Sequence, residues 1–212
     1  MKCKAVIFDL EGTLIQTTFE CISKIVSRTF HDFGVKVSDG DIRNFWFSHK
    51  REELVKKILK IEDPDIFWKV YRKYDVLDLR RQHTNAYSDA DFISELRQKG
   101  LKTGIVTGSP RYTISLAAEI FGEGSFDAVI RTHISEGIKE KPDPHGILEC
   151  LKTLGISNKE AIFVGNGDED ILAARAAGVF DVLIDRGEHD LINETPSLTI
   201  KSLYELREFL DL

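Results

Sequence analysis

Four short polar segments follow apolar runs in this 212-residue sequence, and together they could transfer a phosphoryl group. Asp9 follows the first run, and a Thr-Gly-Ser segment at 107–109 follows the second. Lys141 lies in the loop after the third run, and the acidic segment 166–170 follows the fourth. Phosphoryl transfer needs such a set: a nucleophile, donors for the phosphoryl oxygens, a positive charge and acidic ligands for a metal ion.

The elements that must position these segments are expected to be parallel strands. Runs rich in β-branched residues alternate with helical patterns, as in βαβ units. Because ligands gather at the carboxyl ends of parallel strands, the loops after the strands are expected to meet in one crevice. We predict an α/β fold, a Rossmann-like parallel sheet with helices on both faces. The expected strands are 5–8, 102–108, 126–132, 161–165 and 179–185, and the expected helices include 110–121, 144–154 and 170–177.

A helical insertion interrupts this alternation. We predict a catalytic core formed by residues 1–15 and 83–212 and an inserted α-helical cap over 16–82. The insertion contains both tryptophans, Trp46 and Trp68, and its aromatic side chains are expected to fill a small helical core rather than line a ligand pocket. Its apolar spacing is typical of amphipathic helices, with positions Phe19, Ile22, Ile25, Val26 and Phe30 in one stretch and Ile66, Val70 and Tyr74 in another.

Composition narrows the classes of partner. The net charge is −6, and no long basic block offsets it, so we expect neither nucleic acid nor a membrane as a partner. No apolar run approaches a membrane-spanning length, which favours a cytoplasmic protein. The three cysteines are far apart and include no CxxC pair, which is typical of reduced thiols. Either a monomer or a homodimer is compatible with the sequence.

In their order and spacing, the four segments closely resemble the motifs of the haloacid dehalogenase-like (HAD) hydrolases, most of which are magnesium-dependent phosphatases. The resemblance covers nearly the whole chain. The inserted helices are similar to the cap of the phosphoglycolate phosphatase and β-phosphoglucomutase branch. The resemblance implies that Asp9 attacks phosphorus and forms an aspartyl-phosphate, which water then hydrolyses.

The resemblance also implies a phosphate site. Thr107 and the main-chain amides of Gly108 and Ser109 would hold phosphoryl oxygens, as amides at the start of a helix favour an anion. Lys141 would neutralise charge shared by the nucleophile and the phosphoryl group. Lys139 is the competing candidate for this role.

A magnesium site is implied as well, because a hard cation reduces the repulsion between an anionic nucleophile and the phosphoryl group. Its ligands would be Asp9, the main-chain carbonyl of Glu11, Asn166 and Asp170. Asn166 stands where the family usually has aspartate. An amide oxygen can bind a hard cation but brings no charge, so we expect weaker magnesium affinity. Asp168 or Glu169 could supply a replacement acid through a shifted loop, but Asp168 is rather expected to be the N-cap of the following helix.

Glu11 stands where most family phosphatases carry aspartate as general acid and base. The extra methylene group moves the carboxyl group by about 1.5 Å. Enolase-phosphatases of the same superfamily also carry glutamate here, so Glu11 is compatible with hydrolysis and is expected to exchange protons with the leaving group and with water.

The sequence therefore predicts a magnesium-dependent phosphatase that acts on a small phosphorylated metabolite. Two alternatives stay open: a phosphosugar mutase of the same superfamily, and a catalytically weakened protein that binds phosphate and regulates another process. The substrate itself is not indicated. A basic cluster in the insertion could contact an acidic leaving group or form a solvated helix face, and it consists of Arg43, His49, Lys50 and Arg51.

Overall fold

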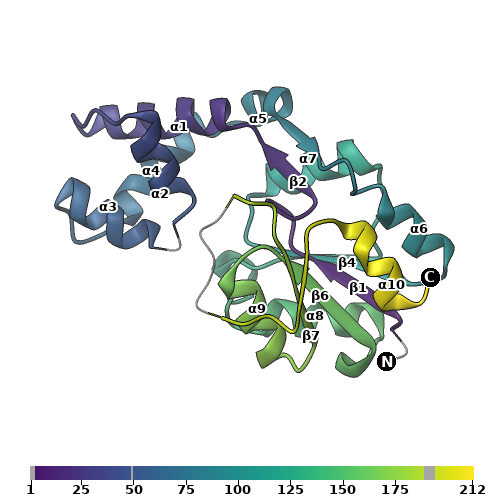
Figure 1. The fold of residues 1–212 in the computed structure, drawn as a ribbon. Coiled ribbons are helices and arrows are strands. Elements are labelled where there is room, and N and C mark those ends of the chain that lie inside the picture. Colours follow the sequence, from purple (N-terminus) through teal and green to yellow (C-terminus); the bar gives the residue numbers. More distant parts are fainter. Residues whose placement is uncertain (1–2, 49, 189–193) are drawn as a thin grey trace. The chain divides into compact units, whose positions relative to one another are not determined.

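The computed structural model describes residues 3–48, 50–188 and 194–212, which form two compact units (Figure 1). One unit comprises Met1–Gln16 and Asn85–Leu212, and the other comprises Thr17–Thr84. Among the described residues, no helix is both long enough and apolar enough to cross a membrane. His49, which belongs to the basic cluster of the insertion, lies outside the described residues.

The first unit contains a six-stranded sheet with the order β5-β4-β1-β6-β7-β8. Every neighbouring pair is parallel, which confirms the predicted fold class. β1 is an inner strand between β4 and β6, so the three strands end at the same edge. The sequence did not indicate β8, which has only three residues. The strands are β1 Ala5–Phe8, β4 Lys102–Thr107, β5 Ala128–Arg131, β6 Ala161–Gly165, β7 Phe180–Ile184 and β8 Leu198–Ile200.

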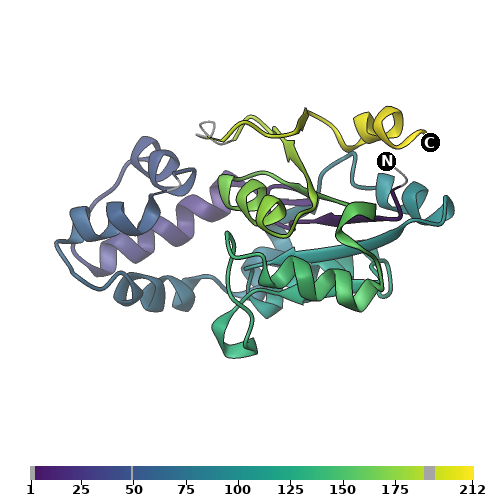
Figure 2. The ribbon, with the colours of Figure 1, turned by 90° about the horizontal axis from the view of Figure 1, so that it is seen from below.

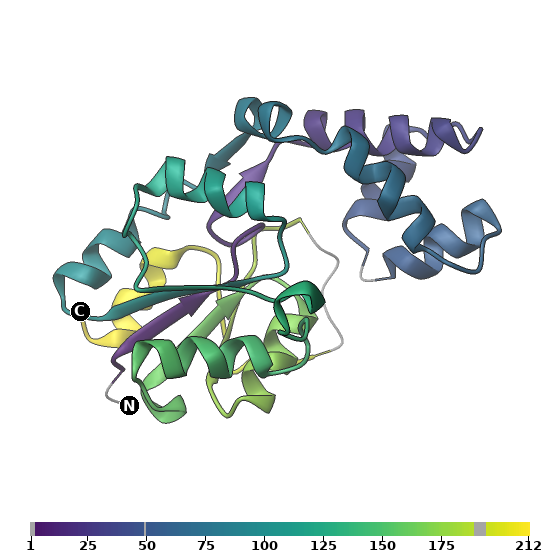
Figure 3. The ribbon, with the colours of Figure 1, turned by 180° about the vertical axis from the view of Figure 1, so that it is seen from behind.

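Helices cover both faces of this sheet, because alternate strand residues point to opposite sides. Val6 and Phe8 enter one apolar cluster, and Ala5 and Ile7 enter the other. The first cluster packs against α6 (Phe92–Gln98), α7 (Arg111–Phe121) and α10 (Leu206–Leu210). The second packs against α8 (His145–Leu154) and α9 (Asp168–Ala176). Figure 2 shows the green helices of the second cluster, and Figure 3 shows α7 and α8 on opposite sides of β4. Three short 3-10 helices are η1 Ile134–Glu136, η2 Asn158–Glu160 and η3 Leu203–Glu205.

The second unit is helical. Its helices are α1 Phe19–Asp32, α2 Asp39–Trp46, α3 Arg51–Leu59, α4 Asp65–Tyr74 and α5 Leu77–His83. Two short strands, β2 (Ile15–Thr17) and β3 (Thr84–Ala86), pair where the chain enters and leaves this unit. The rings of Phe30, Phe45 and Phe67 form its centre, with centroid separations of 4.9 to 5.5 Å. The aromatic residues of the insertion thus form a core, as the composition predicted.

The buried face of α4 differs from the predicted one. Ile66 is 47% exposed, whereas Phe67 is fully buried and Tyr71 nearly so. The predicted spacing is therefore wrong for Ile66, whereas Tyr74 does pack against the core. Turning the larger aromatic side chains inward buries more apolar area.

Two cations of the basic cluster lie against rings of their own unit. The guanidinium of Arg43 lies 3.6 Å from the centroid of the Phe19 ring. That of Arg51 lies 5.4 Å from a ring centroid of Trp46. These contacts give both side chains a structural partner, as expected for cations that cover apolar surface with their stems.

A buried ion pair stabilises the second unit. Arg80 and Asp75 both have side chains only 3% exposed, and Arg80 Nε donates to Asp75 Oδ1 at 2.5 Å. The same guanidinium donates to the hydroxyl groups of Thr17 at 2.8 Å and Tyr71 at 3.2 Å. Arg80 lies near the last residue of this unit and Thr17 is its first, so this hydrogen bond joins the beginning and the end of the unit's sequence. Charged residues in a helix usually face solvent, so the sequence did not indicate this role.

Replacing Arg80 should destabilise this unit strongly. Arg80→Met leaves the Asp75 carboxylate buried without its cation, and we expect a loss of about 3–5 kcal/mol in the free energy of unfolding. Chemical denaturation followed by tryptophan fluorescence measures this loss, since Trp46 and Trp68 are the only tryptophans and both lie in the second unit.

The matched control is Arg81→Met, one residue along the same helix. Arg81 pairs with Asp78 at the surface, with side chains 46% and 87% exposed, and such pairs contribute about 0–1 kcal/mol. Arg80→Met/Asp75→Leu should recover part of the loss because no buried charge is then left unpaired. Equal effects of Arg80→Met and Arg81→Met would contradict the prediction.

Candidate active site

The strand ends bring the predicted nucleophile and its partners to one edge of the sheet. Asp9 directly follows β1, is 8% exposed, and its main-chain N–H donates to the Val164 carbonyl of β6 at 2.9 Å. On the other side of β1, Phe8 pairs with Ile105 of β4, so Thr107 also lies at this edge. Register rather than sequence proximity therefore groups residues that are about 100 positions apart.

Lys141 joins two carboxylates. Its Nζ lies 2.6 Å from Asp9 Oδ1 and 2.6 Å from Asp170 Oδ1, and all three side chains are at most 11% exposed. Lys139, the competing lysine, pairs with Asp143 at 3.1 Å and is 74% exposed. The geometry therefore places Lys141, and not Lys139, beside the predicted nucleophile.

Burial controls the charges of this cluster. Loss of solvation raises the pKa of the Asp9 carboxyl group and that of Asp170, and Lys141 only partly opposes this effect. Burial alone would lower the pKa of Lys141, but the two carboxylates outweigh it and raise that pKa. The Lys141 ammonium thus contacts two carboxyl groups, Asp9 and Asp170, whose pKa values are both raised. An additional cation would favour their charged forms.

A chain of hydroxyl groups lies next to this cluster. Ser109 N–H donates to Thr107 Oγ1 at 3.1 Å, Thr107 Oγ1 donates to Ser109 Oγ at 3.0 Å, and Ser109 Oγ donates to Glu11 Oε2 at 2.7 Å. The sequence places Glu11 and Ser109 in separate motifs and gives no sign of this contact. Phosphate binding through the Ser109 amide would exchange its bond to Thr107 for one to the ligand.

The start of α9 orients Asp170. Asp170 Oδ2 accepts hydrogen bonds from the main-chain N–H groups of Asn166 and Gly167, both at 3.0 Å. Gly167, not Asp168, is the N-cap residue, so the predicted capping role of Asp168 is wrong. The carboxylate of Asp170, at the third helical position, accepts the hydrogen bonds of the free amides at this helix start instead. Asp168 Oδ1 is buried and has no hydrogen-bond partner among the described residues.

Asn166 lies against the turn that follows Asp9. Gly12 has φ of +77°, a left-handed conformation that favours glycine, and a Cβ atom there would collide with the Asn166 amide group. The close packing places the Asn166 side chain against Gly12, the residue after Glu11, whose carbonyl is the predicted main-chain ligand. Gly12 is therefore required both for the turn and for the position of Asn166.

The oxygen atoms that gather here are of the kinds that a hard divalent cation binds. Asp9 and Asp170 share one ammonium within 2.6 Å, and the Asn166 main chain contacts Asp170. Within the described ranges, no group of three or more His, Cys, Asp or Glu side chains is arranged to hold a metal ion. The expected set needs only two carboxylates, because an amide and a main-chain carbonyl supply the other oxygens.

Two half-buried arginines hold the loops that carry these groups. Arg131, at the end of β5, donates from Nε to the Ser109 carbonyl at 2.9 Å and from a terminal nitrogen to Glu136 at 2.8 Å. Arg186, after β7, donates to the Thr13 carbonyl at 2.8 Å and to both oxygens of Asp89. Neither arginine stands out in the sequence, because the carbonyl groups of Ser109 and Thr13 are far from them along the chain.

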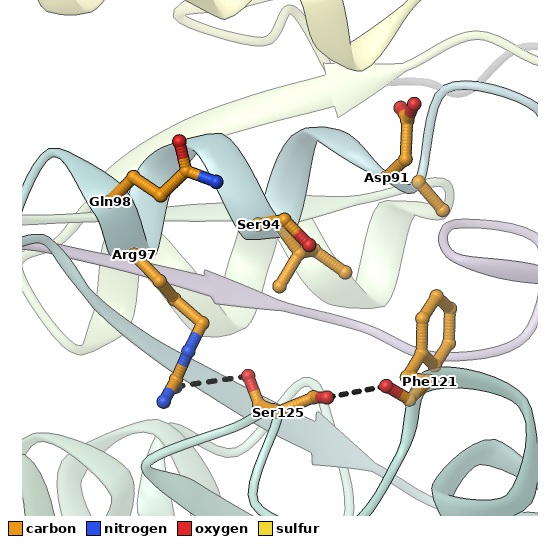
Figure 4. Close-up of a pocket in the computed structure, with 8 residues that line it drawn as sticks. Asp91, Ser94, Arg97, Gln98, Phe121 and Ser125 are labelled. Carbon is orange, nitrogen blue, oxygen red and sulfur yellow. Dashed lines mark hydrogen bonds between the residues drawn. The ribbon is translucent and has the colours of Figure 1, made fainter.

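A cavity of about 290 Å³ lies elsewhere in the first unit (Figure 4). Residues of α6 and of the segment after α7 line it, and Arg97 donates to the Ser125 carbonyl at 3.0 Å beside it. α6 leads into the amino end of β4, whereas the predicted catalytic groups follow the carboxyl ends of the strands. This cavity therefore contains none of the predicted site residues.

Comparisons with known proteins agree with the predicted family. A family model described as haloacid dehalogenase-like hydrolase matches residues 3–178. A pyrophosphatase PpaX from Bacillus pumilus is 28% identical and aligns over 95% of this chain and 93% of its own length. A phosphoglycolate phosphatase from Aquifex aeolicus is 26% identical over 98% and 97% of the two chains.

A solved structure shares the fold. A hydrolase of the haloacid dehalogenase-like family from Streptococcus pneumoniae superposes with a TM-score of 0.80. The superposition covers 98% of both chains at 21% sequence identity. The aligned residues therefore include both units.

Proposed function

The chain belongs to the haloacid dehalogenase-like hydrolases and is a phosphatase-type hydrolase, and from this premise we propose that it is a magnesium-dependent phosphatase that acts on a small phosphorylated metabolite through an aspartyl-phosphate. One observation carries the proposal. Asp9 and Asp170 both contact the Lys141 ammonium at 2.6 Å, at the carboxyl end of an inner strand. This arrangement supports the proposal, because the reaction needs a nucleophile, a positive charge and a second acid in one place.

The proposed reaction has two steps. An oxygen of Asp9 forms a bond to phosphorus while the bond from phosphorus to the leaving oxygen breaks. Glu11 gives that oxygen a proton, so the product leaves as an alcohol or acid. Glu11 then accepts a proton from water, which attacks the aspartyl-phosphate and releases phosphate and free Asp9. Thr107 and Lys141 donate hydrogen bonds to the phosphoryl oxygens in both steps.

Asp9, Asp170, the Asn166 side chain and the main-chain carbonyl of Glu11 would hold the magnesium ion. When bound, the ion would neutralise negative charge between the nucleophile and the phosphoryl group. The pKa values of Asp9 and Asp170, both raised by burial, support this proposal because a cation would favour the ionised nucleophile.

The neutral Asn166 should limit magnesium affinity. Asn166→Asp adds a negative charge among the proposed ligands, and we expect it to tighten magnesium binding about tenfold or more. Isothermal titration calorimetry with magnesium chloride measures the dissociation constant without substrate. Asn44→Asp adds the same charge to an exposed position of α2 and should leave the affinity unchanged. Unchanged affinity in Asn166→Asp would remove Asn166 from the proposed ligand set.

The names of the relatives support a proposal for the class of substrate. The names of two relatives point to inorganic pyrophosphate and phosphoglycolate, both small phosphorylated anions. We propose that this chain's substrate belongs to the same class of small anions.

Hydrolysis of 4-nitrophenyl phosphate tests the proposal, followed by inorganic pyrophosphate, phosphoglycolate and a hexose phosphate. We expect phosphate release with magnesium and none with excess chelator. Conversion of the hexose phosphate to an isomer without phosphate release would indicate a mutase instead. Binding of phosphate without turnover of any compound would indicate a phosphate-binding protein.

A further inference from the structure

Ser109 contacts Glu11, although 98 positions separate them in the sequence. Its Oγ donates to Glu11 Oε2 at 2.7 Å, and Ser109 is only 9% exposed. We propose that Ser109 is a positioning residue that fixes the carboxyl group of Glu11 for proton transfer. This inference rests on the proposed phosphatase function, in which Glu11 is the general acid and base.

The hydroxyl group of Ser109 is itself held in place. The Ser109 N–H donates to Thr107 Oγ1 at 3.1 Å, and its carbonyl accepts from Arg131 Nε at 2.9 Å. The hydroxyl group also accepts a hydrogen bond from Thr107 Oγ1 at 3.0 Å. The two bonds with Thr107 are exchanged when substrate binds, but the bond from Arg131 does not depend on the substrate and keeps Ser109 beside Glu11.

Glu11 needs such a partner because its side chain is long. A carboxyl group that exchanges a proton must stay within hydrogen-bond reach of the reacting oxygen. Glutamate has one more rotatable bond than aspartate, and each free bond lowers the fraction of time in the reactive position. The bond from Ser109 removes this freedom.

The length of Glu11 provides a specific test. In Glu11→Asp the carboxyl group retreats by about 1.5 Å, which takes it out of hydrogen-bond range of Ser109. Loss of the Ser109 hydroxyl should then cost nothing further. We therefore expect Ser109→Ala to lower kcat about 10-fold to 100-fold in the native background, but to have little effect in the Glu11→Asp background.

The experiment measures kcat and KM for magnesium-dependent hydrolysis of 4-nitrophenyl phosphate by the native protein, both single variants and the double variant. Ser109→Ala should lower kcat with little change in KM, and Ser109→Thr, which keeps a hydroxyl group, should retain more activity. Ser115→Ala is the matched control, because the exposed Ser115 hydroxyl only donates to the Arg111 carbonyl within α7. Melting temperatures show whether each variant is folded.

Three outcomes would overturn the inference while the phosphatase function stands. Ser109→Ala could leave kcat unchanged, or it could raise KM alone. In the third outcome, the fold-losses in kcat of Ser109→Ala and Glu11→Asp would multiply in the double variant. The second outcome would assign Ser109 to substrate binding, and the third would make its effect independent of Glu11. A native protein without turnover would contradict the proposed function first, and with it this inference.

Discussion

Asp9→Asn should abolish hydrolysis of 4-nitrophenyl phosphate, with a loss in kcat of at least about 10,000-fold. The amide has nearly the shape of the carboxylate but cannot attack phosphorus to form an acyl phosphate. The fold should persist, because Lys141 keeps its 2.6 Å contact with Asp170. Since burial raises the pKa of Asp9, a neutral side chain there should leave the melting temperature unchanged or higher.

The matched control is Asp143→Asn. The Asp143 carboxylate pairs with the exposed Lys139 and has no role in the proposed reaction. Acid quenching of the native protein during turnover, followed by peptide mass analysis, should also detect a phosphoryl group on the peptide that contains Asp9. Substantial turnover by Asp9→Asn would exclude the aspartyl-phosphate route.

Lys141→Met should lower kcat/KM about 100-fold or more at neutral pH, because it removes a donor to the phosphoryl oxygens. It should also shift the acid side of the pH profile upward. Asp9 attacks in its ionised form, burial raises its pKa and Lys141 opposes that rise. Without Lys141 the pKa rises further, so activity falls at a higher pH as the solution is acidified and partly recovers as the pH increases.

The pH dependence of kcat/KM at saturating magnesium measures both effects. Lys139→Met is the matched control, because Lys139 is 74% exposed and pairs only with Asp143 among the contacts described. Its profile should coincide with that of the native protein. A Lys141→Met profile that is lower at every pH by the same factor would show that Lys141 does not control the ionisation of Asp9.

The sheet and the order of the motifs could be predicted because they depend on local patterns. β1, β4 and β6 are continuous apolar runs, and parallel topology then brings the residues after them together. β8 has three residues, too few for a periodic signal, and β2 and β3 are equally short. Length therefore decided which strands the sequence could indicate.

Contacts between distant residues could not be predicted. Arg80, Arg131 and Arg186 look like surface residues, and only the folded chain shows them buried or half-buried against hydroxyl or carbonyl groups of distant residues. The bond from Ser109 to Glu11 is of the same kind. In α4, several apolar residues follow one another, so periodicity alone did not decide whether Ile66 or Phe67 faces inward. Packing against α1 and α2 made that choice.

The hydrogen bonds of Arg131 and Arg186 affect how this protein loses activity on heating. Arg131 at the end of β5 donates to the carbonyl of Ser109, and Arg186 just after β7 donates to the carbonyl of Thr13, so the loops after β4 and β1 are each bonded to the end of another strand segment. Local opening of either loop must first break these hydrogen bonds, which raises the free energy that such opening costs. Inactivation and loss of the fold of the first unit should therefore be a single cooperative event, without a folded but inactive stage.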